Sequence, residues 1–363
     1  MNAPDILSSI AAELEEQLRG IDPPQRSENA APISTGLASA LLQKSIRRGR
    51  VDLALIAASV LFDNSPDRLW RRLVIIAIED VGLGGLPAMY QAVAASATRR
   101  QLARHLGGWT LAAHVVSTLA ATPKCRASDD LYVAIADCSR WRDDTLEISH
   151  MSFGEALDII AGSGPIERRA IATRCALGAA QNGGPSAERQ HQVRSMFDHL
   201  CEIDQPHTLV EVAREAYRQT GETISAFLPL LHVEFDPTLA HRKSDTFPDQ
   251  TLIGQTPGWA YDKFSHGGRA ALRVFLETDC DTARWLRSHV APGERAGILG
   301  HALFRVESGL VADRVIWPIG QSLRHQADCH SWPFSKEDAA TLLSLLRSEI
   351  GVLNQVRVAA NER

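Results

Sequence analysis

The spacing of apolar residues between positions 37 and 93 constrains the fold of this chain more than any other feature. From Ser39 to Arg50, leucine and isoleucine recur every three to four residues, which is the period of one face of an α-helix. The run from Val51 to Phe62 is almost entirely apolar, as expected for a helix that is buried between neighbours. Pro66 then opens a third helix, from Asp67 to Asp80, and glycines separate that helix from a fourth. Such short connections favour antiparallel pairs of helices.

Two strings in this segment, SALLQKSIRRGRVDLAL and PDRLWRRLVIIAIEDVGL, resemble a known family. They are similar to the C-terminal helical region of the RarA/MgsA family, whose members are AAA+ ATPases related to clamp loaders and linked to replication forks. The matching positions include Ser39, Ala40, Lys44, Arg47, Arg72, Glu79 and Asp80. The resemblance implies that residues 37–93 form a helical collar, which in that family mediates oligomerisation and is separate from the catalytic module.

The sequence lacks the motif of the ATPase module itself. An AAA+ ATPase needs G-x-x-x-x-G-K-[ST], because the backbone amides and the lysine of this loop hold the phosphates of the nucleotide. No such string occurs, and Lys44-Ser45 lies inside an expected helix without a glycine-rich turn before it. We therefore predict a non-enzymatic chain with no cofactor and no catalytic residue in this segment.

Charge is distributed unevenly along the chain. The formal net charge is −5, but residues 36–126 contain twelve Lys and Arg against five Asp and Glu, a net +7, which leaves −12 on the remainder. A basic N-terminal region in an otherwise acidic chain is typical of proteins that bind nucleic acid or an acidic partner through that region. The expected DNA contacts are the cations in and around the first and third helices, namely Lys44, Arg47, Arg48, Arg50 and Arg68.

The alternative is that such charges are solvated or paired inside the fold. Arg71 and Arg72 are the cations expected in structural ion pairs. Their expected partners are Glu79, Asp80 and Asp52. Because adjacent helical residues point about 100° apart, we do not expect the carboxylates of Glu79 and Asp80 to converge on one substrate.

The composition is that of an ordinary globular chain. Of 363 residues, 45% are hydrophobic and 22% are charged, and no apolar run reaches the length of about 18 residues that a membrane span needs. Six scattered cysteines form no C-x-x-C pair, as expected for reduced thiols. We expect a cytoplasmic protein that has no membrane partner.

The rest of the chain is also mostly helical in its spacing, and strand-like alternation is almost absent. The spacing predicts one helix from Thr98 to Ala121, with Gly107-Gly108 as a kink or a close packing point, and one long helix from Ser335 to Ala359. We predict an all-α fold, a multi-helix orthogonal or solenoid-like bundle, with a clamp-loader-collar-like N-terminal part and one long irregular loop. The expected divisions are an N-terminal helix and linker (1–35), a collar-like domain (36–125), a helical body (126–235), the loop (236–268) and a C-terminal helical part (269–363).

Residues 234–268 have little helical periodicity, which is unusual in a helical protein, and long ordered loops are often functional. Their candidate site residues are Asp262, His266 and Trp259. The segment contains neither a metal motif such as H-E-x-x-H nor a nucleophile motif such as G-x-S-x-G. It is therefore an extended strap anchored by Trp259, a partner-binding segment or a catalytic loop.

The densest set of potential metal ligands lies near the C-terminus, at His325, Asp328, Cys329 and His330. Residues four apart share one face of a helix, so a metal could contact both His325 and Cys329. Because no matching set of ligands is evident elsewhere, we predict no metal site.

The sequence leaves three functions open. The leading prediction is a non-enzymatic oligomerising or scaffolding factor in DNA replication or recombination, which contacts DNA or a replication protein through the basic collar helices. The second is an adaptor or inhibitor that binds an AAA+ ATPase without binding DNA. The third is an enzyme with a site in the 234–268 loop. The leading prediction implies a homo-oligomer.

Overall fold

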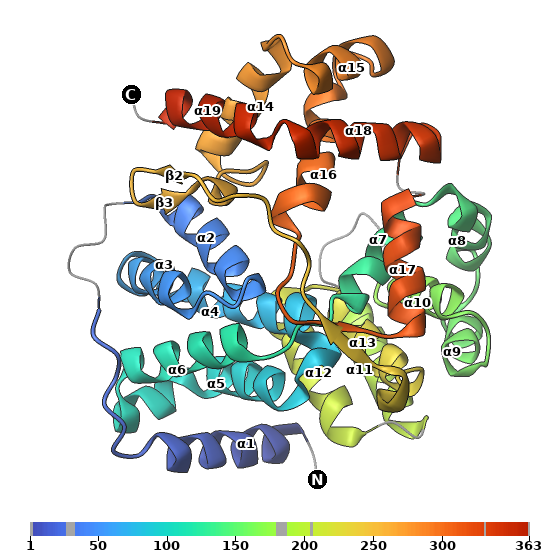
Figure 1. Cartoon of the computed structure of the whole chain (residues 1–363). Helices are drawn as coiled ribbons and strands as arrows, with labels where there is room; N and C mark the ends of the chain where they lie inside the picture. The colour runs from blue at the N-terminus through green and yellow to red at the C-terminus, as the bar shows by residue number, and fades with distance from the viewer. Residues whose placement is uncertain (1–2, 27–32, 179–186, 204–205, 330–331, 362–363) are drawn as a thin grey trace.

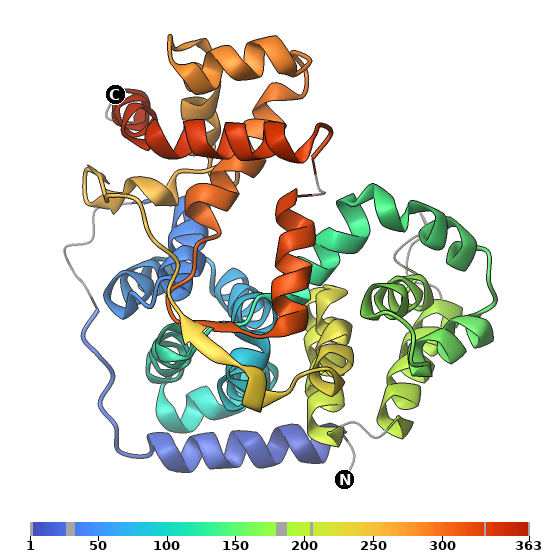
Figure 2. The ribbon, with the colours of Figure 1, turned by 45° about the vertical axis from the view of Figure 1, so that its right-hand side comes forward.

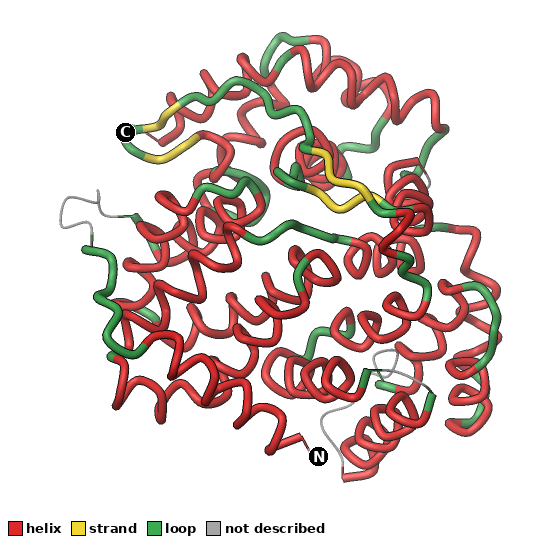
Figure 3. The backbone as a smooth tube through the Cα atoms, turned by 60° about the horizontal axis from the view of Figure 1, so that its bottom comes forward, coloured by secondary structure: helices red, strands yellow, loops and turns green. Residues whose placement is uncertain are grey.

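The computed structural model describes residues 3–26, 33–178, 187–203, 206–329 and 332–361. Within these residues the predicted all-α fold is confirmed, because the strands form only two short antiparallel pairs (Figure 3). The α-helices are α1 (Ala3–Leu18), α2 (Thr35–Arg47), α3 (Val51–Asn64), α4 (Pro66–Ile76), α5 (Leu86–Leu106), α6 (Gly108–Ala121), α7 (Ala127–Asp137), α8 (Arg142–Ser149), α9 (Phe153–Ala161), α10 (Ile166–Ala176), α11 (Ala187–Glu202), α12 (His207–Thr220), α13 (Ile224–Val233), α14 (His266–Glu277), α15 (Asp281–His289), α16 (Arg295–Leu303), α17 (Pro318–Cys329), α18 (Lys336–Ser348) and α19 (Ile350–Asn361). The π-helical turns are η1 (Ala77–Val81) and η6 (Phe304–Ser308), and the 3₁₀ turns are η2 (Gly82–Gly84), η3 (Ser139–Trp141), η4 (Pro237–Leu239) and η5 (Gly258–Ala260). The strands are β1 (His241–Lys243), β2 (Leu252–Ile253), β3 (Thr256–Pro257) and β4 (Arg314–Ile316).

The helices are stacked so that the two termini lie at opposite ends of the molecule (Figure 1). Helix α1 crosses one end and packs against α5 and α12. Helices α14, α15, α16, α18 and α19 form the other end, with α2 directly below them. Helix α17 lies between α16 and α18 in the sequence but is not part of this group. It packs against α7, as the turned view in Figure 2 also shows.

Local sequence signals explain the first helices. The hydroxyl of Ser34 caps α2 by accepting a hydrogen bond from the N–H of Leu37 at 3.2 Å. The helix ends at Arg47, and Gly49 follows with φ of +67°, a conformation that glycine adopts without strain. Pro66 occupies the first turn of α4, where its missing N–H leaves no bond unmade. Helix α4 then continues directly into the π-helical turn η1, a wider turn that is frequent at functional sites.

Two predicted long helices are each divided in two, so those predictions were wrong. Gly107 is a full break and not a kink, because its φ of +80° ends α5, and α6 packs back against α5. The C-terminal helix ends at Ser348 and restarts at Ile350. Between them, the carboxylate of Glu349 accepts hydrogen bonds from the first two backbone N–H groups of α15, at 2.8 Å each. This contact satisfies helix-end donors that would otherwise lack a partner.

Buried apolar side chains form two clusters. The first core contains residues from α1 to α13 together with Trp259, Ala260, Trp317 and Leu323. The second core lies between Leu272 and Leu353 and is built mainly from α14, α15, α16, α18 and α19. Helix α17 thus lies late in the sequence but packs on the first core. The domain divisions themselves stay a prediction.

The 234–268 segment is mostly irregular, as expected, and two short strand pairs hold its middle part. Strand β1 pairs antiparallel with β4, with Arg242 opposite Val315, and β2 pairs with β3 in a tight hairpin. The carboxylate of Asp245 accepts a hydrogen bond from the N–H of Val311 at 2.9 Å and forms an ion pair with Arg314 at 2.9 Å. These contacts hold the segment across the helices.

None of the described helices is long and apolar enough to cross a membrane. All six cysteines are free thiols. Three of them, Cys125, Cys138 and Cys280, are buried.

Candidate functional site

Helix α2 directs its cations toward the second half of the chain and not toward solvent. The Lys44 ammonium lies 2.9 Å from the Asp262 carboxylate, and the two side chains are only 4% and 3% exposed. The ammonium also donates to the carbonyl of Ala260 at 3.2 Å. Burial lowers the pKa of Lys44, although the charge of Asp262 opposes that shift. Lys44 is therefore part of a buried ion pair.

Arg47 lies one turn later and is also buried. Its Nε donates to Asp80 Oδ1 and its Nη2 donates to Glu79 Oε1, at 2.6 Å in each case. Its Nη1 donates to the carbonyl of Ser308 at 3.2 Å. One guanidinium thus joins α2 to η1 and η6, so it lies at the junction of the two halves of the chain.

Arg48 is held mainly by aromatic rings. Its guanidinium lies 4.7 Å from the ring centre of Phe247 and 4.6 Å from that of Trp259. Its Nη2 donates to the carbonyl of Glu307 at 2.9 Å. Burial is the largest of the effects that lower the pKa of Arg48 to about 10.

Only two of the five predicted DNA contacts are exposed. Arg50 is exposed and pairs with Asp52 at 2.7 Å, and Arg68 is exposed on α4. The expectation that Lys44 and Arg47 face solvent was wrong, because residues 258–264 and 304–308 cover that side of α2. Helical spacing could not reveal this cover, since it comes from distant parts of the chain.

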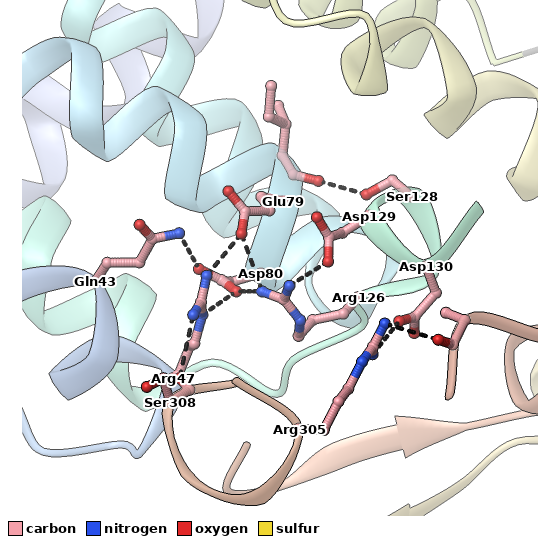
Figure 4. Close-up of polar contacts among 12 residues, drawn as sticks. Gln43, Arg47, Glu79, Asp80, Arg126, Ser128, Asp129, Asp130, Arg305 and Ser308 are labelled. Atoms are coloured by element: carbon pink, nitrogen blue, oxygen red, sulfur yellow. Dashed lines mark hydrogen bonds and ion pairs between the residues drawn. The ribbon is translucent and has the colours of Figure 1, made fainter. Parts of the chain in front are cut away.

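Glu79 and Asp80 lie in η1 and share two arginines, as Figure 4 shows. Besides Arg47, Arg126 contacts both carboxylates, with Nη1 at 3.2 Å from Glu79 Oε1 and in a close contact with Asp80. Arg126 also pairs with Asp129, which follows it on α7. The two carboxylates therefore share the same guanidinium groups in a structural ion network, and the expectation that they do not converge on one substrate stays a prediction.

The predicted partners of Glu79 and Asp80 were also wrong. Arg71 instead donates to the carbonyl of Thr220 at 2.7 Å and lies 3.7 Å from Glu222. Arg72 donates to the side-chain carbonyl of Gln43 at 3.3 Å. The partners are Arg47 and Arg126, and the packing of α7 against η1 brings Arg126, which lies far along the sequence, close to both acids.

The environment separates the proton affinities of the two acids. Burial raises the pKa of Glu79, and the adjacent charge of Asp80 raises it further. Burial also acts to raise the pKa of Asp80, but the charges of Arg47 and Arg126 outweigh it and hold that pKa below its ordinary value. Asp80 is therefore the carboxylate around which the two arginines gather, and their charges favour its ionised form.

A pocket of about 390 Å³ opens beside this network, between α2, α4, α7 and residues 262–264 and 301–305. We call it the cationic pocket, because its lining includes six Lys and Arg residues and three Asp and Glu residues, a net +3. It is lined by Gly36, Ser39, Ala40, Gln43, Lys44, Arg47, Arg68, Arg72, Glu79, Asp129, Tyr132, Val133, Asp262, Lys263, Phe264, His301, Phe304 and Arg305.

Burial, and to a smaller extent nearby positive charge, lowers the pKa of two groups in the cationic pocket. Burial lowers the pKa of His301 to about 3, and the nearby charges of Arg305 and Lys263 contribute in the same direction. Burial likewise lowers the pKa of Arg72, with Arg68 among the positive neighbours. His301 is therefore a neutral imidazole at physiological pH.

Part of the chain is similar to a known protein family. Residues 51–145 match the family described as MgsA AAA+ ATPase C terminal. The resemblance of residues 37–93 is thereby confirmed over its larger part and extended to α8. No curated protein and no solved structure matches the chain significantly. We call residues 51–145 the MgsA-like segment.

The MgsA-like segment contributes α4, η1 and α7 to the site, and therefore both acids and Arg126. Six positions that carried the sequence resemblance line the cationic pocket, namely Ser39, Ala40, Lys44, Arg47, Arg72 and Glu79. Positions recognised through the family resemblance thus converge on one place in the fold. Sequence reasoning missed Arg126, Asp129 and Tyr132, which follow the recognised strings.

Outside the MgsA-like segment, the three candidate residues of the 234–268 loop have different surroundings. Trp259 is buried, and its indole N–H donates to Gln250 at 3.3 Å, as expected of an anchor. Asp262 is buried against Lys44, and its carboxylate also accepts a hydrogen bond from the N–H of Phe264 at 3.0 Å. His266 is exposed at the start of α14. Because the carboxylate of Asp262 is already paired, it is not available as a free base.

Two of the potential metal ligands, Asp328 and Cys201, contact other side chains. Asp328 pairs with Arg305 at 3.1 Å, and His330 lies outside the described residues.

A second set of potential metal ligands was not evident from the sequence. The ligand atoms of Cys201, His207 and Glu211 lie within 4.8 Å of one another. Burial and the charge of Glu211 raise the pKa of Cys201 to about 11, so the thiol keeps its proton and donates to Glu211.

Proposed function

We propose that this chain is a non-enzymatic scaffolding factor in DNA replication or recombination, and that it acts through protein contacts. The observation that carries the proposal is the match of residues 51–145 to the C-terminal family of the MgsA AAA+ ATPase. A collar-like segment in a sequence without G-x-x-x-x-G-K-[ST] supports assembly but not ATP hydrolysis. The expected partners are a second copy of this chain or an AAA+ ATPase of the MgsA type.

The placement of the α2 cations favours protein contacts over DNA contacts. Phosphate contacts need cations that meet solvent, whereas Lys44 and Arg47 are buried in ion pairs. If they turned outward to bind phosphate, their carboxylate partners would remain buried and uncompensated. Among the predicted contacts, only Arg50 and Arg68 remain on the surface.

Light scattering after size-exclusion chromatography tests the proposal. The purified chain is measured alone and mixed with a purified AAA+ ATPase of the MgsA type. A homo-oligomer, or a stable complex that changes the ATPase rate, supports the proposal. A monomer that leaves both the elution and the hydrolysis rate of the ATPase unchanged overturns it.

A further inference from the structure

The acids of the cationic pocket are all engaged within the protein. Asp262 is held by Lys44, and Glu79 and Asp129 are both held by Arg126. The carboxylates that line the pocket are therefore already committed to other cations.

Arg68 and Arg72 line the pocket without a carboxylate in ion-pair contact among the described residues. They are four residues apart on α4, so they share one face of the helix. Arg68 is exposed, and the hydrogen-bond partner of Arg72 is the neutral side chain of Gln43. Two like charges one turn apart repel each other, and an anion between them removes that repulsion. A guanidinium group can donate two parallel hydrogen bonds to the oxygens of one phosphate. Phosphate is therefore the anion that best matches this arrangement.

Two exposed aromatic rings belong to the same pocket. Phe264 is 64% exposed and Tyr132 is 39% exposed. The Lys263 ammonium lies 5.1 Å from the ring centre of Phe264, which places a cation beside that ring. Aromatic rings beside cations are the combination with which proteins bind nucleotides, because the ring stacks on a base while the cations contact the phosphate.

We infer that the cationic pocket binds a nucleotide, with its phosphate between Arg68 and Arg72 and its base against Phe264 or Tyr132. The nucleotide is either free or the phosphorylated end of a DNA strand, because both present the same phosphate and base. The volume of about 390 Å³ lies within the range of roughly 300–1,000 Å³ that is typical of small-molecule sites. This inference goes beyond the scaffolding function and does not depend on it.

Isothermal titration of the full chain with five probes tests the inference. The probes are thymidine 5′-monophosphate, thymidine, inorganic phosphate, and a six-nucleotide single strand with and without a 5′-phosphate. The expected result is saturable binding of a phosphorylated probe at least about tenfold tighter than that of its unphosphorylated counterpart. If the monophosphate binds as well as the phosphorylated strand, the ligand is a free nucleotide. If only the strand binds, the ligand is a DNA end.

Three variants locate the binding. Arg68→Ala and Arg72→Ala are each expected to weaken binding about tenfold, since each removes a charged donor to phosphate. Phe264→Ala is expected to weaken nucleotide binding about fivefold or more without changing the affinity for inorganic phosphate. Arg50→Ala, an exposed arginine outside the pocket, is the control and should bind like the unaltered chain.

Two results would overturn the inference. One is the absence of saturable binding for every phosphorylated probe at millimolar concentration. The other is binding that Arg68→Ala and Phe264→Ala both leave unchanged while circular dichroism shows that the variants are folded. Because both altered side chains are exposed, their replacement is not expected to unfold the chain.

Discussion

Lys44 and Asp262 form a buried ion pair at 2.9 Å, between α2 and the irregular segment that precedes α14. One turn later, Arg47 reaches the carbonyl of Ser308 in η6. The opposite side of α2 packs Leu42 and Ile46 into the first core. Helix α2 therefore contributes to the first core with its apolar face and contacts the C-terminal half with its cations. Removal of those cations should reduce stability before it affects any binding activity.

Replacing Lys44 by methionine is expected to lower the free energy of unfolding by about 3–5 kcal/mol, because Asp262 would keep a buried charge without a partner. Urea denaturation at neutral pH measures this difference. The double variant Lys44→Met/Asp262→Leu removes both charges and should recover most of the lost stability. If Lys44→Met stays within about 1 kcal/mol of the unaltered chain, the pair is screened by solvent and our description of α2 is incorrect.

Asp80→Asn is expected to destabilise the chain by a similar amount, about 3–5 kcal/mol, because Arg47 and Arg126 would lose their shared carboxylate inside the fold. Arg50→Ala is the matched control, since its pair with Asp52 is exposed and should contribute only about 0–1 kcal/mol. Thermal and chemical denaturation of both variants provide the comparison. Equal losses in the two variants would show that burial of the network does not matter.

Sequence spacing predicted the helices that carry the site but not the contacts that complete it. Ser34, Gly49 and Pro66 mark helix ends by local chemistry, which can be read from neighbouring residues. Gly107 was predicted as a kink or a close packing point and not as a break, and the break at Glu349 was missed, because the apolar spacing continues across both positions. Local propensity does not show that a carboxylate will cap another helix far away in sequence.

The ion network shows the same limit more clearly. Glu79 and Asp80 were recognised as paired acids, but Arg126 lies directly before α7 and could not be chosen over the nearer Arg71 or Arg72. The burial of Lys44 likewise depends on a segment that lies far along the chain. Helical periodicity reports which residues share a face, and it does not report which segment covers that face.

Lys124 gives the chain a specific pH dependence. It is 1% exposed, and burial lowers its pKa from 10.5 to about 8, against the charges of Asp80 and Asp313. The unfolded chain retains the ordinary value, so between pH 8 and pH 10.5 the unfolded state binds more protons than the folded state. The contribution of Lys124 to stability should therefore rise with pH across this window, by on the order of 2–3 kcal/mol.

The difference in unfolding free energy between the unaltered chain and Lys124→Met isolates this contribution. Buried thiols also titrate at alkaline pH, and their effects cancel in the difference. We expect the free energy of unfolding of the unaltered chain to rise relative to that of the variant between pH 7.5 and pH 10, as measured by urea denaturation. A difference that is flat or falls with pH would mean that Lys124 is not desolvated in the folded state.

The central claim is that the cations of α2, together with Arg48 directly after it, hold the protein together and do not bind DNA. Fluorescence anisotropy with labelled DNA that has no ends tests it most directly, because such DNA cannot offer a terminal phosphate to the cationic pocket. The probes are a circular single strand and a closed dumbbell duplex, each titrated across a range of salt concentrations. We predict no salt-sensitive binding at micromolar protein concentration. Micromolar or tighter binding that weakens steeply with salt, and that is lost in a folded Arg48→Ala variant, would contradict the claim.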